Sequence, residues 1–281
     1  GPVDVVARLV QAELGQRLGA PVIVENRPGV SGMLAADVLL SQPPDGQTLL
    51  LCTHYEAMNP VMYRSAKYKV SDLAGVSLLA RYYLALAVSP QSKFSNLNDI
   101  IAAAKADPGK LTYGSAGLAS LAHLAAALFT SDMGIDITHV PYKSSAQSSI
   151  DIIAGRLDMQ FATVGPTLAN IRDGTLRALA TTGKKRVSSL PEVPTMMEAG
   201  VKDYDVALWL AYEMPAGTPD AIVGKLNRAM GEILKEPDVI ETFAKQGFDP
   251  EPGPPDAVTT RIRSETELWR ALVAKTGIKV E

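Results

Sequence analysis

Small and hydroxyl-bearing residues gather at four places where a predicted strand or turn runs into a predicted helix. The four segments are GPVD at residues 1–4, YGSAGLAS at 113–120, PYKSSAQSS at 141–149 and ATVGPT at 162–167. The first backbone N–H groups of a helix have no intrahelical acceptor, and the helix dipole adds a partial positive charge at this end. Such helix ends bind carboxylate or phosphate without lysine or arginine. The segments therefore predict anion-binding turns.

The serines of these turns also have a simpler interpretation. Ser115, Ser120, Ser144 and Ser145 are suited to be helix N-caps, each of which would stabilise its helix by about 1 kcal/mol. For a single turn both interpretations stay open. Four such turns in one chain, together with the lack of a catalytic motif, favour an anion-binding cleft, because the carboxyl ends of parallel strands meet at one edge of a sheet.

Motifs of catalytic and metal sites are incomplete in this sequence. YGSAG carries Tyr113 where a Gly-x-Ser-x-Gly nucleophile elbow requires glycine. The histidines His54, His123 and His139 lack the spacing of zinc ligands. We therefore predict no catalytic residue, no metal site and no cofactor. A serine hydrolase that uses Ser115 with His123 is the alternative, although eight positions of helix would separate the two by about 12 Å.

Composition and charge exclude several classes of protein. The chain has 281 residues, of which 47% are hydrophobic and 20% charged, as in ordinary globular proteins. The net charge of −3 argues against nucleic acid as a partner. Cys52 is the only cysteine, so no intrachain disulfide can form. No signal peptide is visible, and residues 1–19 already resemble a turn entering a helix. We expect a leader and a first strand to be missing from the chain.

Predicted strands and helices alternate along the sequence, which favours an α/β fold with mainly parallel sheets. PVIVEN at residues 21–26 is predicted as a short strand because of its β-branched residues. A length of 281 residues is near the size at which one core divides into two lobes. YYLALAV at 82–88 and DVALWLAYEMP at 205–215 are the candidate segments that cross between the lobes.

Many segments, in the same order over nearly the whole chain, are those of a known family. They include VENRPGVSG at 24–32, AAAKADPGKLTYGSAG at 102–117, IRDGTLRALATTGKKR at 171–186 and LPEVPTMMEAG at 190–200. In these segments the chain resembles the Bug-type (TctC-like) periplasmic solute-binding proteins of tripartite tricarboxylate transporters. The number and order of the matches make this resemblance specific, whereas any one motif would be weak.

The resemblance implies a type II periplasmic-binding fold, in which two α/β lobes are joined by a two-strand hinge and close on a ligand. The lobes would comprise residues 1–82 with 208–281, and residues 83–207. It also implies a periplasmic, non-enzymatic monomer that binds a small mono- or dicarboxylic acid, and no nucleic acid, and delivers it to membrane permease subunits. An orphan binding subunit that serves signalling stays open as an alternative.

The resemblance further implies where the ligand binds, through backbone amides, hydroxyls and water. The implied positions are Val3, Asp4, Thr53, His54, Ala57, Ser115, Gly117, Leu118, Ala119, Ser120, Tyr142, Lys143, Ser144, Ala162 and Thr163. Trp209 is added as a ring that would stack on an aromatic acid, with packing as the alternative. Lys143 would pair with a second carboxylate or remain solvated. Glu213 is expected to face away from the ligand.

Overall fold

The chain forms two compact units in the computed structural model, which describes residues 2–64, 66, 68–118 and 120–278. Unit 1 comprises Gly1–Arg81 and Leu208–Glu281, and unit 2 comprises Tyr82–Ala207. The chain therefore passes between the units twice, once inside the long strand β2 (Leu73–Val88) and once at the start of β7 (Ala207–Pro215). The boundary inside β2 lies one residue before the one expected from the sequence.

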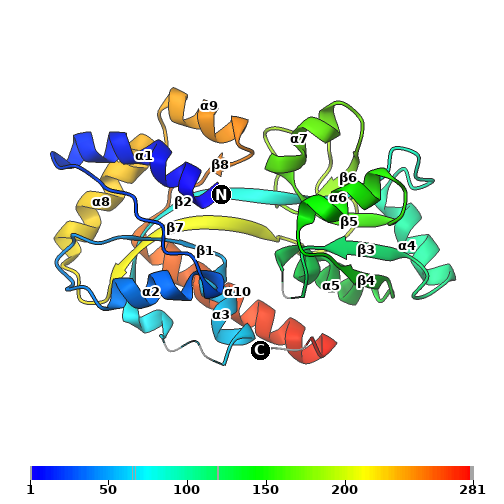
Figure 1. Ribbon diagram of the computed structural model, residues 1–281, viewed down its shortest axis with the longest axis horizontal. Coiled ribbons are helices and arrows are strands. Elements are labelled where there is room, and N and C mark those ends of the chain that lie inside the picture. Colours follow the sequence, from blue (N-terminus) through cyan, green and yellow to red (C-terminus); the bar gives the residue numbers. More distant parts are fainter. Residues whose placement is uncertain (1, 65, 67, 119, 279–281) are drawn as a thin grey trace. The chain divides into compact units, whose positions relative to one another are not determined.

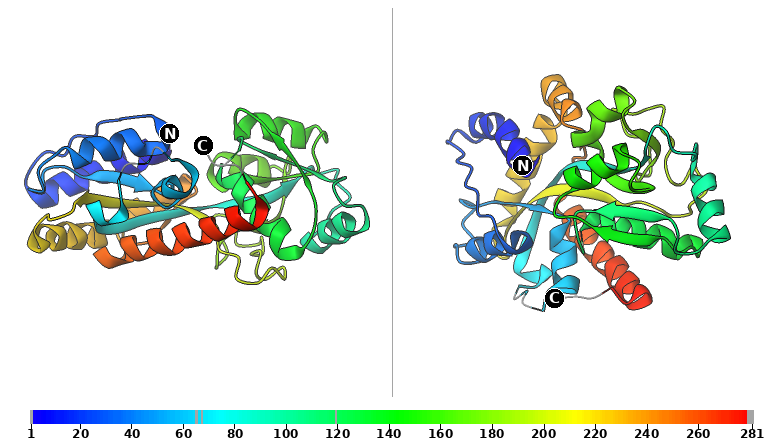
Figure 2. Two further views of the ribbon diagram at one scale, coloured as in Figure 1. Left: turned by 90° about the horizontal axis from the view of Figure 1, so that it is seen from below. Right: turned by 45° about the vertical axis from the view of Figure 1, so that its right-hand side comes forward.

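Unit 1 consists of a small sheet with helices around it. Besides parts of β2 and β7, its elements are α1 (Pro2–Leu18), η1 (Val30–Gly32), α2 (Met33–Leu40), β1 (Leu50–Thr53), α3 (Tyr55–Met62), η2 (Val70–Asp72), α8 (Asp220–Ile233), α9 (Pro237–Lys245), β8 (Asp249–Pro250) and α10 (Pro255–Thr276). β7 lies between β1 and β2 in the sheet. The long helix α10, red in Figure 2, packs against α3.

Unit 2 is built on a sheet that includes the second part of β2. Its other elements are α4 (Leu97–Ala106), β3 (Thr112–Ser115), α5 (Leu121–Met133), β4 (Thr138–Pro141), α6 (Ser145–Ile153), β5 (Met159–Thr163), α7 (Val164–Arg172) and β6 (Arg177–Thr181). β3 is flanked by β4 and β5, both parallel to it (Figure 1). Neighbouring residues of β3 point to opposite faces, where Tyr113 meets His123 of α5 and Gly114 meets Ser148 of α6.

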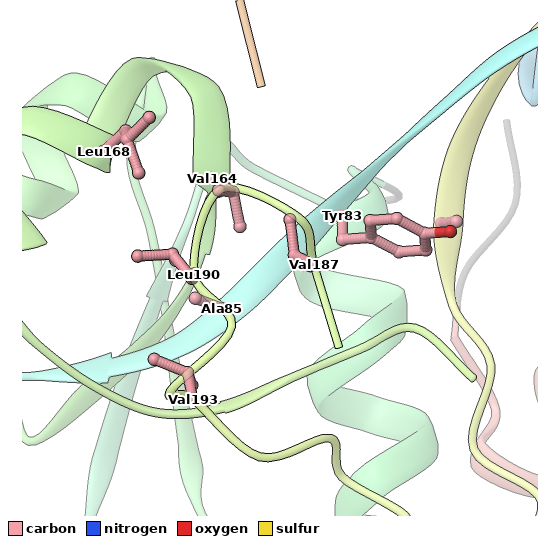
Figure 3. Close-up of a cluster of buried hydrophobic side chains, with 8 residues drawn as sticks. Tyr83, Ala85, Val164, Leu168, Val187, Leu190 and Val193 are labelled. Atoms are coloured by element: carbon pink, nitrogen blue, oxygen red, sulfur yellow. The ribbon is translucent and has the colours of Figure 1, made fainter. Parts of the chain in front are cut away.

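Apolar side chains from four parts of unit 2, one of them Ala207 at the start of β7, form one of its cores (Figure 3). Tyr83 and Ala85 come from β2, and Val164 and Leu168 come from α7. Three further members, Val187, Leu190 and Val193, come from the segment that follows β6. That segment contains no helix or strand of its own, so burial of these side chains fixes it to the unit.

Two sequence-based expectations about the sheets are wrong. The pairs of β1 with β7, and of β2 with β5, β6 and β8, are antiparallel, so the sheets are not mainly parallel. The reason is that β2 enters unit 2 from unit 1 and runs against the strands beside it. Residues 21–26 form no strand either, and Ile23 is 79% exposed. β-Branched residues favour a strand only when neighbouring strands and a core are there to pack against.

Gly114→Val is expected to lower the free energy of unfolding by about 1–3 kcal/mol, because it overfills the space between β3 and α6. A Cβ atom at Gly114 would lie 2.2 Å from Ser148 Oγ and 2.7 Å from Leu157 Cδ1. Urea denaturation would measure the loss. Gly231→Ala in α8 is the control, because nothing lies within 4 Å of its Cβ position, and it should be neutral or stabilising. Equal stability of Gly114→Val and the parent chain would contradict this packing.

Candidate functional site

Three helix N-termini gather at one edge of the unit 2 sheet. β3, β4 and β5 run parallel, with Ser115 opposite Pro141 and Tyr113 opposite Met159, so their carboxyl ends lie at the same edge. The next element after each strand is a helix, respectively α5, α6 and α7. The Tyr142 N–H donates to Ser115 O at 2.9 Å and joins the first two turns. Three of the four predicted turns therefore converge, and we call this region the carboxyl edge of unit 2.

The turn before α5 is held by its own polar groups. The Gly117 N–H donates to Ser115 Oγ at 3.1 Å, and the Ser120 hydroxyl donates to Gly117 O at 2.8 Å. Gly117 has a φ of 104°, which favours glycine. Ser120 Oγ also accepts the His123 N–H at 3.3 Å, so Ser120 is the N-cap of α5. Leu118 projects from this turn and is 67% exposed. Ala119 lies outside the described residues.

The turn before α6 contributes one cation. The Gln147 N–H donates to Ser144 Oγ at 3.4 Å, so Ser144 is the N-cap of α6. The Tyr142 hydroxyl donates to Asp151 Oδ2 at 2.6 Å, a bond that raises the pKa of Tyr142. Lys143 is exposed. Its ammonium group can therefore meet an anion only by giving up part of its hydration.

The third turn, between β5 and α7, has few polar side chains. Ala162 is buried within β5, where it lies opposite Ala85 of β2. Thr163 is half-buried and precedes α7 without a side-chain cap bond, and its carbonyl accepts the Thr167 hydroxyl at 2.7 Å. The predicted ligand positions of unit 2 thus include no carboxylate that would repel an anion.

A cluster of rings lies behind the first turn, and sequence reasoning missed how it is arranged. The His123 and His139 rings stack at 4.2 Å, and Tyr113 stacks on His139 at 4.9 Å. His139 Nε2 is 2.7 Å from Ser115 Oγ, so the histidine beside Ser115 is His139 rather than His123. Burial, with the neighbouring His139, lowers the pKa of His123 to about 4, and burial also lowers the pKa of His139. Both rings are therefore neutral at pH 7.

The predicted ligand residues at the start of unit 1 are engaged within that unit. Val3 is half-buried in the first turn of α1. Asp4 accepts bonds from Arg8 Nε at 2.9 Å and Asn26 Nδ2 at 2.7 Å, and these bonds lower its pKa. The Asp4 carboxylate is thus ionised, and its hydrogen bonds go to neighbouring side chains of unit 1.

His54 follows β1 directly and is buried beside the Tyr55 ring. The Tyr55 N–H donates to Thr53 Oγ1 at 3.2 Å, and Ala57 is fully buried. His54 is 3% exposed, and neither of its ring nitrogens meets a hydrogen-bond partner in the part of the chain that the structure describes. Burial lowers its pKa to about 3, so the ring is neutral. A neutral imidazole with two unmatched nitrogens can receive one hydrogen bond and donate another.

Two residues near the second crossing are core residues of unit 1. Trp209 is fully buried, and its indole N–H donates to Glu265 Oε2 at 2.8 Å, which supports packing rather than stacking on a ligand. Glu213 is 1% exposed and lies opposite Leu50 of β1. Its carboxyl group is therefore inside the unit, and burial raises its pKa to about 7.

Comparison with known proteins assigns the family. The model of the tripartite tricarboxylate transporter family receptor (TctC) matches residues 6–278. The chain belongs to this family. BugT of Bordetella pertussis is 36% identical over 284 aligned residues, which cover 100% of this chain and 87% of BugT. A protein in the tcbD–tcbE intergenic region of Pseudomonas sp. strain P51 is 34% identical, with 98% of this chain and 82% of that protein covered.

Solved structures similar to this TctC-family chain include ligand complexes. Rpa4515 of R. palustris with adipate has a TM-score of 0.81 and 31% identity, covering 99% of this chain and 94% of Rpa4515. MatC of Rhodopseudomonas palustris with bound malate has a TM-score of 0.75 and 26% identity, covering 97% and 95%. The chain has the two-lobed α/β fold of type II periplasmic-binding proteins, as the resemblance implied.

Family membership agrees with the chemistry found at the carboxyl edge. TctC-family receptors are periplasmic solute-binding proteins, which is a class without enzymatic activity. Among the residues that the structure describes, no cluster of three or more His, Cys, Asp or Glu side chains could hold a metal ion. The helices in the described ranges also include none with the length and apolar character to span a membrane. The carboxyl edge presents helix N-termini, hydroxyl groups and the exposed side chain of Lys143.

Proposed function

We propose that this chain is the extracytoplasmic receptor subunit of a tripartite tricarboxylate transporter, and that it captures a small mono- or dicarboxylic acid for a membrane permease. The observation that carries the proposal is the convergence of the N-termini of α5, α6 and α7 at one sheet edge. No carboxylate belongs to the predicted ligand positions there. The adipate and malate complexes of two similar proteins support a carboxylate as the ligand.

The affinity for a carboxylate must come from several weak interactions. A dissociation constant of 1 μM corresponds to about −8.2 kcal/mol. One helix N-terminus contributes roughly 0.3–1 kcal/mol, whereas hydrogen bonds to a charged group contribute about 1.5–3 kcal/mol each. Donors from three turns at the carboxyl edge, with Lys143 beside them, are therefore needed together. The proposal assigns the carboxylate to this edge.

A thermal-shift screen of adipate, malate, hexanoate and benzoate should find at least one stabilising acid. A ligand at 100 times its dissociation constant adds about 2.7 kcal/mol to the stability of the folded state. The matched controls are the amides of the same acids, which keep the shape and lose the charge. Amides that stabilise as strongly as the acids would contradict a site centred on carboxylate, and no stabilising acid would contradict the proposed function.

A serine hydrolase is the second candidate, because Ser115 Oγ lies 2.7 Å from His139 Nε2. Ser115 is 2% exposed, and its hydroxyl oxygen already accepts the Gly117 N–H. A buried and bonded hydroxyl cannot reach an ester, so the geometry favours a structural role. Turnover of p-nitrophenyl acetate that is lost in Ser115→Ala would reverse this ranking. Delivery to a permease, as opposed to signalling, would be tested by co-purification with membrane subunits.

A further inference from the structure

The hydroxyl oxygen of Ser115 lies within hydrogen-bond distance of three polar atoms, but the hydroxyl group has only one proton to donate. Its Oγ lies 2.7 Å from His139 Nε2, 3.1 Å from Gly117 N and 3.0 Å from Gly117 O. Gly117 O also accepts the Ser120 hydroxyl at 2.8 Å and the Ser120 N–H at 3.3 Å. A carbonyl oxygen has two lone pairs, and a serine hydroxyl has one proton. The tautomer of His139 therefore decides how these groups are matched.

The two tautomers of neutral His139 give different balances of donors and acceptors. With the proton on Nε2, the imidazole donates to Ser115 Oγ, and the hydroxyl must turn to Gly117 O as a third donor on that oxygen. With the proton on Nδ1, Nε2 accepts the Ser115 hydroxyl. The distance from Ser115 Oγ to Nε2 is the shortest of the three contacts of this oxygen. Gly117 O then keeps only the two donors from Ser120. In the second case the Ser115 hydroxyl, the Gly117 N–H and the two Ser120 donors each keep a partner, and Gly117 O accepts no more than two hydrogen bonds.

We propose that His139 is a positioning residue of the carboxyl edge, whose unprotonated Nε2 accepts the Ser115 hydroxyl and thereby fixes the turn before α5. The proposal rests on the proposed function, because that function supplies the ligand that binds at this edge. His139 lies on β4 opposite Tyr113 of β3, and the β3 residue Ser115 points to the same face as Tyr113. The bond therefore runs diagonally between the two strands, from the last residue pair of the ladder to the pair two positions before it.

The rings around His139 fix the direction of its Nε2. Tyr113 and His123 stack on the imidazole with interplanar angles of 22° and 14°. Stacked rings restrict rotation of the imidazole about its side-chain bonds, so Nε2 stays aimed at Ser115. The Ser115 oxygen is thereby held as the acceptor of the Gly117 N–H, and Ser120 is left to cap α5. The ring cluster thus sets the position of a helix N-terminus that binds anions.

The tautomer can be read in the ligand-free chain by long-range ¹H–¹⁵N NMR of the histidine rings at pH 7. The chain has three histidines, so the signals lost in His139→Gln are those of His139. We expect a protonated Nδ1 and an unprotonated Nε2. A protonated Nε2 would overturn the proposal without any need for a variant to fold.

Two variants that differ by one methylene group test the positioning role. The side-chain oxygen of His139→Gln can reach the place of Nε2, whereas that of His139→Asn cannot. We expect the Gly117 amide, which donates to Ser115 Oγ, to exchange with deuterium about tenfold faster in His139→Asn, since one neutral hydrogen bond is lost. Exchange in His139→Gln should stay within about threefold of the parent, because the bond is kept. Tyr113→Phe keeps a stacked ring and is the control. Equal exchange in the Gln and Asn variants would overturn the proposal.

Adipate binding measured by calorimetry gives the functional readout. We expect the dissociation constant to rise about tenfold in His139→Asn and less than threefold in His139→Gln, in parallel with amide exchange. Unchanged affinity in His139→Asn would contradict a role in positioning the site. If the parent chain binds no acid in the screen, the proposed function fails, and the NMR and exchange results still decide whether His139 fixes the turn.

Discussion

Replacing Trp209 with alanine is expected to lower the free energy of unfolding by about 3–5 kcal/mol. The side chain is among the largest that are fully buried, so its removal leaves a cavity. It also removes the indole N–H that donates to Glu265 Oε2 at 2.8 Å and ties β7 to α10. Guanidinium denaturation would measure the loss. Trp269 on α10, the only other tryptophan, provides the fluorescence signal in the variant.

Trp209→Phe separates packing from recognition of a ligand. Phenylalanine fills most of the space and lacks the N–H group, so we expect a loss of stability well below that of Trp209→Ala. Acid binding by Trp209→Phe should resemble that of the parent chain, because the Trp209 ring lies inside unit 1. A large loss of binding to an aromatic acid with little loss of stability would instead favour stacking, the interpretation first attached to this residue.

Local sequence signals predicted the features that depend on neighbours along the chain. Of the four serines considered as N-caps, Ser120 and Ser144 are N-caps, whereas Ser115 ends β3 and Ser145 is the first residue of α6. The turns after β3, β4 and β5 could be placed because small and hydroxyl residues follow short apolar segments. Their convergence followed from the rule that parallel strands end at one edge. These features need only the order of elements and the chemistry of each turn.

Features that depend on pairing across the chain could not be predicted. Ser115 and His139 are 24 residues apart, and only the register of β3 with β4 brings them together. Sequence reasoning considered His123, which is nearer in the chain, as the partner. Likewise, nothing local shows that β2 runs antiparallel to β5 and β6, since that direction follows from the passage of the chain between the units.

The surroundings of Glu213, a polar residue in an apolar strand, could not be predicted from the sequence. It was expected to face away from the ligand, and the structure places it inside unit 1 near a second buried carboxyl group, that of Glu56. Glu213 Oε2 and Glu56 Oε2 have no hydrogen-bond partner among the described residues. Burial and the neighbouring Glu213 raise the pKa of Glu56 to about 8, and burial raises that of Glu213 to about 7.

We expect the free energy of unfolding to fall as the pH rises from 6.5 to 8.5. A carboxyl group whose pKa is raised by folding binds its proton more tightly in the folded state, so its contribution is present at low pH and lost as the pH rises through the folded pKa. Each such group lowers the free energy of unfolding by up to about 1.4 kcal/mol per pH unit until the pH reaches its folded pKa, and its effect levels off above that value. The window begins at 6.5 because the lowered pKa values of His54 and His123 act in the opposite direction below it.

Chemical denaturation of Glu56→Gln/Glu213→Gln across the same pH range should give a flatter curve than the parent chain, because glutamine does not titrate. Glu198→Gln is the control, since the Thr195 N–H and Arg186 lower the pKa of Glu198 and place its effect at lower pH; its curve should run parallel to that of the parent. Parallel curves for the double variant and the parent would show that neither buried carboxyl holds a proton at neutral pH. A flatter curve would show that the folded unit holds the pair as protonated, neutral acids at the lower end of this range.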